Sequence, residues 1–364
     1  MFIEQAYKGK TDWWRYVIGI IIIFSGWQLL GVIPLSIVAY IAAGNMEMFI
    51  AAAENNFMDL AIDPNLFLFL LILMFTCGLL GLWFAVKFVH EQSFKDVTTT
   101  RDKVDWSRIW FAFLMVIAVN LPLFIIGYFL SPEDLVWNFD PVPFLILVII
   151  SFFFLPLQTS FEEYLFRGYL MQGFGILNRK SLVIVLAIVT LALGALAYFT
   201  SAGIDNIISI IFFVFLVLLL LMLFTNHRAR ALILTSVFFG LLHSLNPEVE
   251  KLGYIMMVFY IGTGFLLGIM TLMDEGLELA LGFHAANNIF AAILVTTDWT
   301  AFQVPALFTD ISEPSAGFDV VIPVVIIYPI YLFILAKKYS WTNWKDKLLG
   351  KIENPQMLNP SEEG

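Results

Sequence analysis

The sequence predicts an all-α fold, a polytopic transmembrane bundle of about ten helices. Hydrophobic residues make up 60% of the 364 residues and charged residues only 13%, whereas soluble domains have roughly 25% charged residues. The apolar runs are continuous rather than alternating, which favours helices over the strands of a membrane barrel. The basic residues also gather in alternate loops, as in a chain that crosses a membrane repeatedly.

Ten apolar segments are candidate helices. Several are shorter than the ~20 residues that a helix needs to span a bilayer, and one is longer. The first segment is too long for the core of a signal peptide, so we expect it to be retained as a membrane helix. The candidate helices cover residues 17–43, 65–89, 109–130, 141–171, 181–200, 206–225, 231–245, 252–273, 279–296 and 320–337.

The loops predict that both termini are cytoplasmic. Lys and Arg are retained on the cytoplasmic side of a membrane. Loops 44–64 and 131–140 contain neither residue, whereas the N-terminal segment, loop 87–108 and the tail are rich in them. Of all the basic residues, only Lys251 falls outside the predicted cytoplasmic set. The chain is therefore predicted to be a multi-pass integral membrane protein with a cytoplasmic tail, residues 339–364, that is amphipathic and then disordered.

The composition excludes several classes of function. The single cysteine, Cys77, lies in an apolar run and cannot form an intramolecular disulfide. No basic stripe or nucleic-acid-binding signature is present, so we expect no nucleic acid as a partner. The partner that the composition does predict is the lipid bilayer.

The stretch FEEYLFRGY places charged residues at the end of a long apolar run. Ionisable residues inside a span cost roughly 2.5–3.5 kcal/mol on insertion, so these residues are candidate site residues. Glu163 and Arg167 are four residues apart, share a helix face and can form an ion pair. Glu162 points about a hundred degrees away, so a simple ion pair at a helix end leaves it unexplained.

The residues before the glutamates predict how their helix begins. Pro156 is expected to break the preceding helix. Thr159 and Ser160 each precede a glutamate by three residues, which is the pattern of a capping box. A new helix is therefore expected to start near Thr159, with both glutamates in its first turn.

Two further apolar segments each contain a histidine. Phe239 and His243 are four residues apart in SVFFGLLHSL, and His284 and Asn288 are four residues apart in LGFHAANNIF. Each histidine or asparagine alone is most simply explained by a hydrogen bond between helices. Two glutamates, two histidines and an asparagine in one membrane domain are better explained by a hydrolytic site.

Such a set contains the groups that hydrolysis requires. A carboxylate or an imidazole can take a proton from water, and His and Asn can donate hydrogen bonds to an oxyanion. Glu162, His243 and His284 could instead hold a zinc ion with an open fourth position. The sequence permits both the zinc and the metal-free mechanism. The other histidines, His90 and His227, lie at predicted cytoplasmic ends and are interpreted as surface residues.

The order of these motifs resembles the CPBP family of intramembrane proteases. This family includes the CAAX prenyl endopeptidases of the Ras-converting-enzyme type and the Abi-like bacteriocin-processing and immunity proteins. The resemblance rests on EExxxR, then FxxxH, then HxxxN, on separate helices, and it covers about residues 140–297. The matching residues are Glu162, Glu163 and Arg167 for the first motif, Phe239 and His243 for the second, and His284 and Asn288 for the third.

The resemblance implies an organisation of the chain. The family has a core of eight helices, so the segment at about 181–225 is interpreted as a helical hairpin inserted in a protease core of residues 141–297. Residues 1–140 would supply N-terminal membrane helices and loops. Residues 298–338 would supply an exoplasmic loop and the last membrane helix.

The resemblance also implies roles for the site residues. Glu162 with His243 would activate water, and His284 with Asn288 would stabilise the oxyanion. Glu163, Arg167 and Phe239 would order the site. The implied activity is endopeptidase cleavage of a membrane-associated, prenylated or other peptide substrate.

Two other classes of function are weighed against this one. A non-catalytic bacteriocin-immunity or membrane scaffold protein of the same fold predicts that Glu162→Ala retains function. A transporter with a proton relay is disfavoured, because the polar residues cluster in one region and no inverted repeat is visible.

Overall fold

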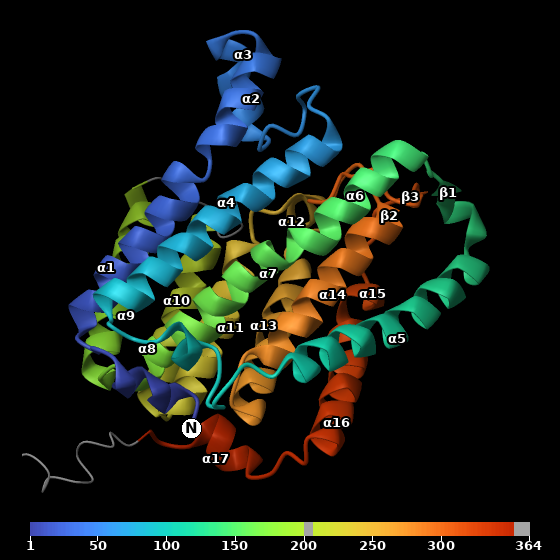
Figure 1. Ribbon diagram of the computed structural model, residues 1–364. Coiled ribbons are helices and arrows are strands. Elements are labelled where there is room, and N and C mark those ends of the chain that lie inside the picture. The colour runs from blue at the N-terminus through green and yellow to red at the C-terminus, as the bar shows by residue number, and fades with distance from the viewer. Residues whose placement is uncertain (200–206, 353–364) are drawn as a thin grey trace, which may run out of the picture.

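The computed structural model describes residues 1–199 and 207–352, and these residues form a helical bundle (Figure 1). The described residues of all ten predicted segments are mostly helical. The longer helices are α1 (Trp13–Phe24), α2 (Ile33–Ala43), α4 (Pro64–Phe84), α5 (Trp106–Leu130), α6 (Pro141–Phe153), α9 (Arg179–Phe199), α10 (Ile207–Phe224), α11 (His227–Leu242), α13 (Met256–Asp274), α14 (Glu278–Leu294) and α16 (Tyr328–Lys338).

Short elements join and extend these helices. The short helices are α3 (Met46–Glu54), α7 (Leu155–Glu163), α8 (Met171–Ile176), α12 (Pro247–Leu252), α15 (Phe318–Ile322) and α17 (Trp344–Leu349). Strands β1 (Leu135–Trp137), β3 (Phe308–Asp310) and β2 (Val295–Thr296) form a small sheet in that order, in which β3 is antiparallel to β1 and parallel to β2. The sequence did not predict this sheet, because its strands are too short to show an alternating pattern.

Seven helical segments of the described residues are long and apolar enough to cross a membrane. They are Trp13–Ala43, Pro64–Val89, Trp106–Leu130, Pro141–Ile176, Arg179–Leu196, Met256–Asp274 and Val320–Lys338. The bundle also contains two shorter apolar helical segments, Ile210–Met222 and Glu278–Leu294. The prediction of a polytopic helical bundle is confirmed, although fewer than ten of its helices are of full spanning length.

The N-terminal segment and α17, the last described helix, lie at the same end of the bundle (Figure 1). The backbone N–H of Phe2 donates to Glu275 Oε2, and the Lys347 ammonium lies 3.5 Å from Glu275 Oε1. The predicted amphipathic tail forms α17, which packs against α11 and α13. Its predicted disordered end, residues 354–364, lies outside the described residues.

Many basic residues are held at this same end of the bundle. Arg101 and Arg108 both pair with Asp274 at the end of α13, and Lys8 pairs with Asp96. The indole N–H of Trp341 also donates to Asp274. This clustering of cations agrees with the loop pattern of the sequence, in which every second loop is basic, because alternate loops of a membrane protein lie on the same side of the membrane.

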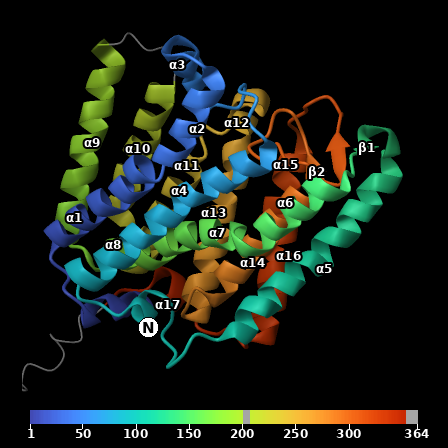
Figure 2. The same ribbon diagram turned by 45° about the horizontal axis from the view of Figure 1, so that its top comes forward.

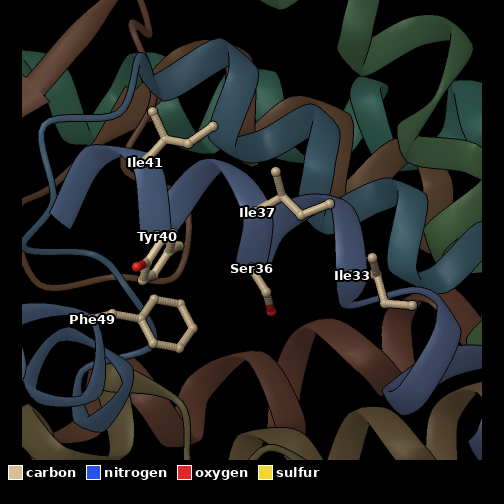
Figure 3. A pocket seen from close by; sticks show the side chains of 6 residues that line it. All are labelled: Ile33, Ser36, Ile37, Tyr40, Ile41 and Phe49. Atoms are coloured by element: carbon tan, nitrogen blue, oxygen red, sulfur yellow. The ribbon is translucent and has the colours of Figure 1, made fainter. Parts of the chain in front are cut away.

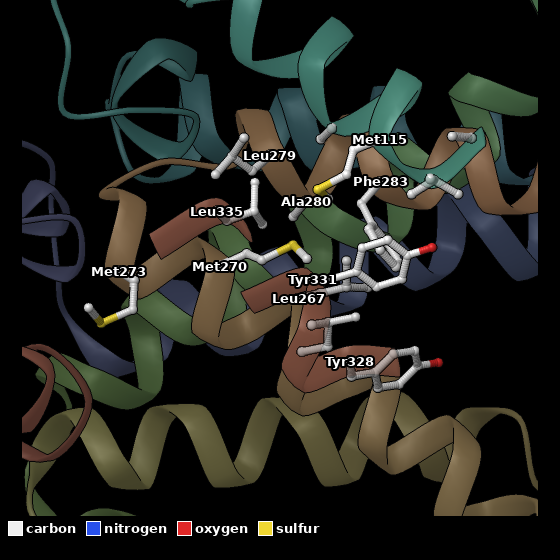
Figure 4. Packing of buried hydrophobic residues seen from close by; sticks show 14 of the residues in the cluster. Met115, Leu267, Met270, Met273, Leu279, Ala280, Phe283, Tyr328, Tyr331 and Leu335 are labelled. Carbon is white, nitrogen blue, oxygen red and sulfur yellow. The ribbon is translucent and has the colours of Figure 1, made fainter. Parts of the chain in front are cut away.

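One hydrophobic core joins α5, α13, α14 and α16. Met115, Met270, Phe283 and Tyr331 lie against one another in it (Figure 4). Helix α14 packs so closely along α5 that a Cβ atom at Gly282 would lie 2.0 Å from the backbone oxygen of Ile109. The third motif is therefore held on a helix whose position depends on a glycine.

We expect Gly282→Ala to destabilise the protein by about 1–3 kcal/mol, because a methyl group there forces α14 away from α5. The matched control is Gly127→Ala on α5, where no atom lies within 4 Å of the added Cβ. Melting temperatures of the purified variants in detergent measure the difference. An unchanged melting temperature for Gly282→Ala would contradict this account of the packing.

Helices α9 and α10 pack against each other beside α11 (Figure 2). They coincide with the segment predicted to form a helical hairpin, and residues 200–206 between them lie outside the described residues. Leu186, Leu218 and Met222 of this pair are buried against Leu234 of α11. The pair is therefore packed directly on the helix that contains the second motif.

A shallow groove lies between α2 and α3. Ile33, Ser36, Ile37, Tyr40, Ile41 and Phe49 line it (Figure 3). Its only side-chain polar groups are two hydroxyls, so it lacks the groups that hydrolysis needs. The chemistry of the protein must be sought among the buried charges of the bundle.

Candidate active site

The break before the glutamates lies where Pro156 predicts it, but the new helix begins earlier than expected. Helix α6 ends at Phe153 and α7 begins at Leu155. Proline is favoured in a first helical turn, because its fixed φ suits the helix and it has no N–H to leave unbonded. The Thr159 hydroxyl donates to the backbone oxygen of Pro156 and caps nothing. The predicted start near Thr159 is wrong, and the glutamates lie in the last turn of α7.

A π-helical turn, Tyr164–Leu170, follows the glutamates directly. Such turns are rare and occur frequently at functional sites. Arg167 lies in it with no exposed surface, and its Nη1 donates to Glu163 Oε1 at 3.0 Å. The predicted ion pair is confirmed, and it is fully buried.

The guanidinium of Arg167 is fixed by two more contacts. Its Nη2 donates to the backbone oxygen of Gly264 on α13 at 3.2 Å. Its Cζ lies 4.2 Å from the centre of the Phe239 ring on α11, within the range of a cation–π interaction. Arg167 of the first motif therefore contacts the helix of the second motif. Phe239 contributes to the site through this contact of its ring with the guanidinium.

His284 joins the third motif to the first. Its Nδ1 lies 2.7 Å from Glu163 Oε1, and its Nε2 lies 3.6 Å from Glu162 Oε2. An ionised carboxylate can only accept a hydrogen bond, so Nδ1 has the proton. His284 therefore lies between the two carboxylates of the first motif and contacts both of them.

Glu162 has a neighbour that the sequence analysis missed. Gln158 donates from its amide to Glu162 Oε1, and it accepts at 3.2 Å from Asn288 Nδ2. Gln158 therefore links the first motif to Asn288 and gives Glu162 a hydrogen-bond partner of its own, separate from the Glu163–Arg167 ion pair. The spacing of Gln158, one helical turn before Glu162, was the available signal.

His243 lies at the end of α11, as the C-cap residue. Its Nδ1 lies 2.7 Å from the backbone oxygen of Phe239, which can only accept, so this nitrogen has the proton. In the neutral ring Nε2 then has a free lone pair. The ring stacks on that of Tyr260, with 4.4 Å between centres and an angle of 21°. Tyr260 belongs to no motif and was also missed, since only the packing of α13 on α11 reveals it.

The structure brings all seven predicted site residues into one connected cluster. Ring centres of Phe239 and His243 are 4.7 Å apart, and those of Phe239 and His284 are 6.0 Å apart. Burial is graded across the cluster, from Glu163 and Arg167 with no exposed surface to His243 and Asn288, which are half-buried.

The two histidines interpreted as surface residues differ from that expectation. His90 is buried, with Nε2 at 2.8 Å from the Tyr169 hydroxyl and Nδ1 at 2.8 Å from the backbone oxygen of Lys10. His227 is half-buried at the start of α11. A sequence cannot show that residues 1–12 fold back over these positions.

The residues do not fit the zinc site that the sequence permits. Glu162 Oε2 and His284 Nε2 are 3.6 Å apart, close to the about 3.4 Å expected for two ligands of one tetrahedral ion. Among the described residues, however, no group of three or more His, Cys, Asp or Glu side chains is arranged to hold a metal ion. A catalytic zinc takes three protein ligands, and the set of Glu162, His243 and His284 does not provide them.

The fold and this cluster define an integral membrane protein with buried acid–base groups at its centre. Residues 211–290 match the family model of the Rce1-like type II CAAX prenyl endopeptidases. That segment contains the second and third motifs, and the first lies outside it. The match supports membership of the chain in the CAAX-type protease family, and it confirms the resemblance predicted from the motifs.

One relative covers most of the chain. The uncharacterized protein YyaK of Bacillus subtilis (strain 168) is 26% identical over 306 residues, which are 83% of this chain and 85% of the relative. No solved structure matches the chain.

Proposed function

We propose that the protein is an intramembrane endopeptidase that uses Glu162 as general base. The observation that supports this most directly is the placement of Glu162 Oε2, which has no hydrogen-bond partner among the residues that the structure describes and lies 3.6 Å from His284 Nε2. Leaving a buried carboxylate oxygen unpaired is costly, and a catalytic base needs such a free oxygen. The family match supports hydrolysis of a peptide bond as the reaction class.

The residues divide the steps of this reaction among them. Glu162 takes a proton from a water, and the lone pair on His243 Nε2 accepts the other O–H of that water and orients it. The hydroxide oxygen attacks the peptide carbonyl carbon, and the electron pair of the C=O bond moves to its oxygen. Collapse of this intermediate breaks the C–N bond, and Glu162 returns its proton to the leaving nitrogen.

Two donors are available for the oxyanion. The protonated Nε2 of His284 is one, and the Glu163 carboxylate at Nδ1 stabilises that charge. The amide of Asn288 is the other, because only one of its two N–H groups is needed for Gln158. Donors fixed before the reaction, in a site that excludes water, give the largest stabilisation of a developing oxyanion.

The experiment that tests this function compares new protein termini in membranes. Three cell lines are used, with the native protein, with Glu162→Gln, and with neither. We expect termini that require the native protein, and they also identify the substrate. If the native and variant profiles coincide while both proteins are inserted, the proposal fails and a binding role is favoured.

Tyr260 is expected to act by holding His243. Tyr260→Phe keeps the stacked ring, so we expect a rate within about threefold of the native protein. Tyr260→Leu removes the stack and lets the His243 ring turn, so we expect kcat to fall about 10–100-fold, since small misplacements of a catalytic group are costly. Kinetics on a cleaved peptide measure both. Equal rates for the two variants would show that the stack is irrelevant.

A further inference from the structure

The first turn of α11 forms a second cluster of titratable groups, far from the candidate active site. It contains His227, Arg228 and Arg230. His243 of the candidate active site is sixteen residues after His227, which is about 24 Å along the helix. The cluster lies at the end of the bundle where both chain ends pack, because Arg228 bonds to Glu4 and its backbone N–H donates to Gly350. Nothing in the proposed peptidase reaction uses these residues.

Arg230 is a buried cation without a counter-charge. It is only 1% exposed. Among the described residues, the one hydrogen bond of its side chain goes to a neutral group, the backbone oxygen of Leu177. Within residues 1–199 and 207–352, no carboxylate forms an ion pair with it, whereas Arg228 has Glu4 and Arg167 has Glu163. A buried charge that is left unpaired is strongly destabilising. An anion bound next to Arg230 would offset this cost.

Three buried polar atoms in this one turn have no hydrogen-bond partner within the described part of the chain. They are His227 Nδ1, Arg228 Nη1 and Arg230 Nε. Buried polar atoms are almost always bonded, and orphans grouped in one place indicate a ligand or an ordered water. A water would satisfy hydrogen bonds but would leave the charge uncompensated. An anion with several acceptor oxygens satisfies both requirements.

Other cations surround the same turn. Burial lowers the pKa of the His227 imidazole, and the nearby Arg230, Arg179 and Lys351 lower it further. Burial, and the charge of Arg179, also lower the pKa of Arg230 to about 10. The basic groups of three separate segments, the starts of α9 and α11 and the segment after α17, therefore converge without an acidic group among these causes. A bound anion would reverse the lowering of both pKa values.

The turn has further features of an anion site. Asn226 precedes the sixteen-residue helix α11 and makes no side-chain capping bond to it, so its positive end is not capped by a side chain. Phe224, beside the turn, is 86% exposed. An exposed aromatic ring next to a basic cluster at the end of membrane helices is typical of the interface, where anionic headgroups lie.

We propose that the first turn of α11, with Arg179 and Lys351, binds a phosphate group, as an anionic phospholipid presents it at the membrane surface. Arg230 would donate from Nε, and the planar guanidinium groups suit phosphate oxygens better than a lysine does. The bound headgroup would hold α9, α11 and the segment after α17 together. This site is independent of the peptidase proposal.

The test uses the full chain purified in detergent and its melting temperature. Short-chain phosphatidylglycerol, short-chain phosphatidylcholine and inorganic phosphate are added in separate titrations. We expect a concentration-dependent rise with phosphatidylglycerol and none with phosphatidylcholine. An equal rise with inorganic phosphate would assign the site to a free anion, which still supports a phosphate site. No rise with phosphatidylglycerol or phosphate would overturn the proposal.

Variants place the effect at this turn. Lys351 is exposed, so Lys351→Gln preserves the fold, and loss of its charge is expected to weaken phosphatidylglycerol binding about fivefold. Arg230→Lys keeps the charge, loses the fork of donors and is expected to weaken binding further. The matched control is Lys87→Gln, which removes an exposed cation outside the cluster. Equal binding by native protein and Lys351→Gln would overturn the proposal, even if Arg230→Lys does not fold.

Discussion

Replacing Glu162 by glutamine is expected to lower the rate of peptide-bond cleavage by about 10²–10⁴-fold, the usual contribution of a general base. Glutamine has nearly the same shape, so it can keep the contact with Gln158, but its amide cannot take a proton from water. The substitution also removes the negative charge 3.6 Å from His284 Nε2, one of the proposed oxyanion donors. Both consequences act on the same step, which is why this effect should be the largest of any single substitution.

The measurement is single-turnover cleavage of a peptide identified from the membrane termini. The control is Glu91→Gln, which removes an exposed carboxylate whose partner is the surface residue Lys10. We expect the control to cleave at the native rate. Melting temperature shows whether each variant is folded. A folded Glu162→Gln protein that cleaves within tenfold of the native rate would assign the base to another group, and His243 would be the next candidate.

The helices and the order of the motifs were predictable because they depend on local sequence. Continuous apolar runs give the helices, and the spacing of four residues gives the Glu163–Arg167 pair. The gathering of the seven motif residues followed from the family resemblance and not from the pattern itself. The break at Pro156 was predictable. The start of the next helix was not, because a proline in the first turn and a threonine at the N-cap are both typical of a helix start, and the sequence does not show which of the two applies.

The remaining site residues depend on contacts between distant segments. Tyr260 reaches His243 only because Gly240 and Gly264 let α11 and α13 approach closely, and a Cβ at Gly264 would lie 2.6 Å from the backbone oxygen of Ser236. No periodicity in the sequence reports such an approach. The burial of His90 likewise depends on the N-terminal segment, whose Lys10 carbonyl oxygen lies 2.8 Å from His90 Nδ1.

Loss of either member of the Glu163–Arg167 pair is expected to destabilise the protein by about 3–5 kcal/mol, because it leaves an uncompensated buried charge. Neither side chain has exposed surface. Arg167→Met should leave Glu163 without the cation that holds it, with only His284 as partner. Glu163→Leu should leave Arg167 with the Gly264 oxygen and the Phe239 ring, neither of which bears a charge.

The double variant Glu163→Leu/Arg167→Met separates the charge from the packing. Replacing a buried ion pair by apolar residues of similar volume is often neutral or stabilising, so we expect the double variant to be more stable than either single one. Unfolding in sodium dodecyl sulfate measures the three free energies of unfolding.

The double variant should nevertheless be inactive, because His284 loses the carboxylate that fixes its Nδ1 proton. If all three variants are as stable as the native protein, Glu163 and Arg167 do not form a buried pair of opposite charges. If the double variant is stable and still cleaves, Glu163 does not order His284, and the proton on its Nε2 must be held by Glu162 alone.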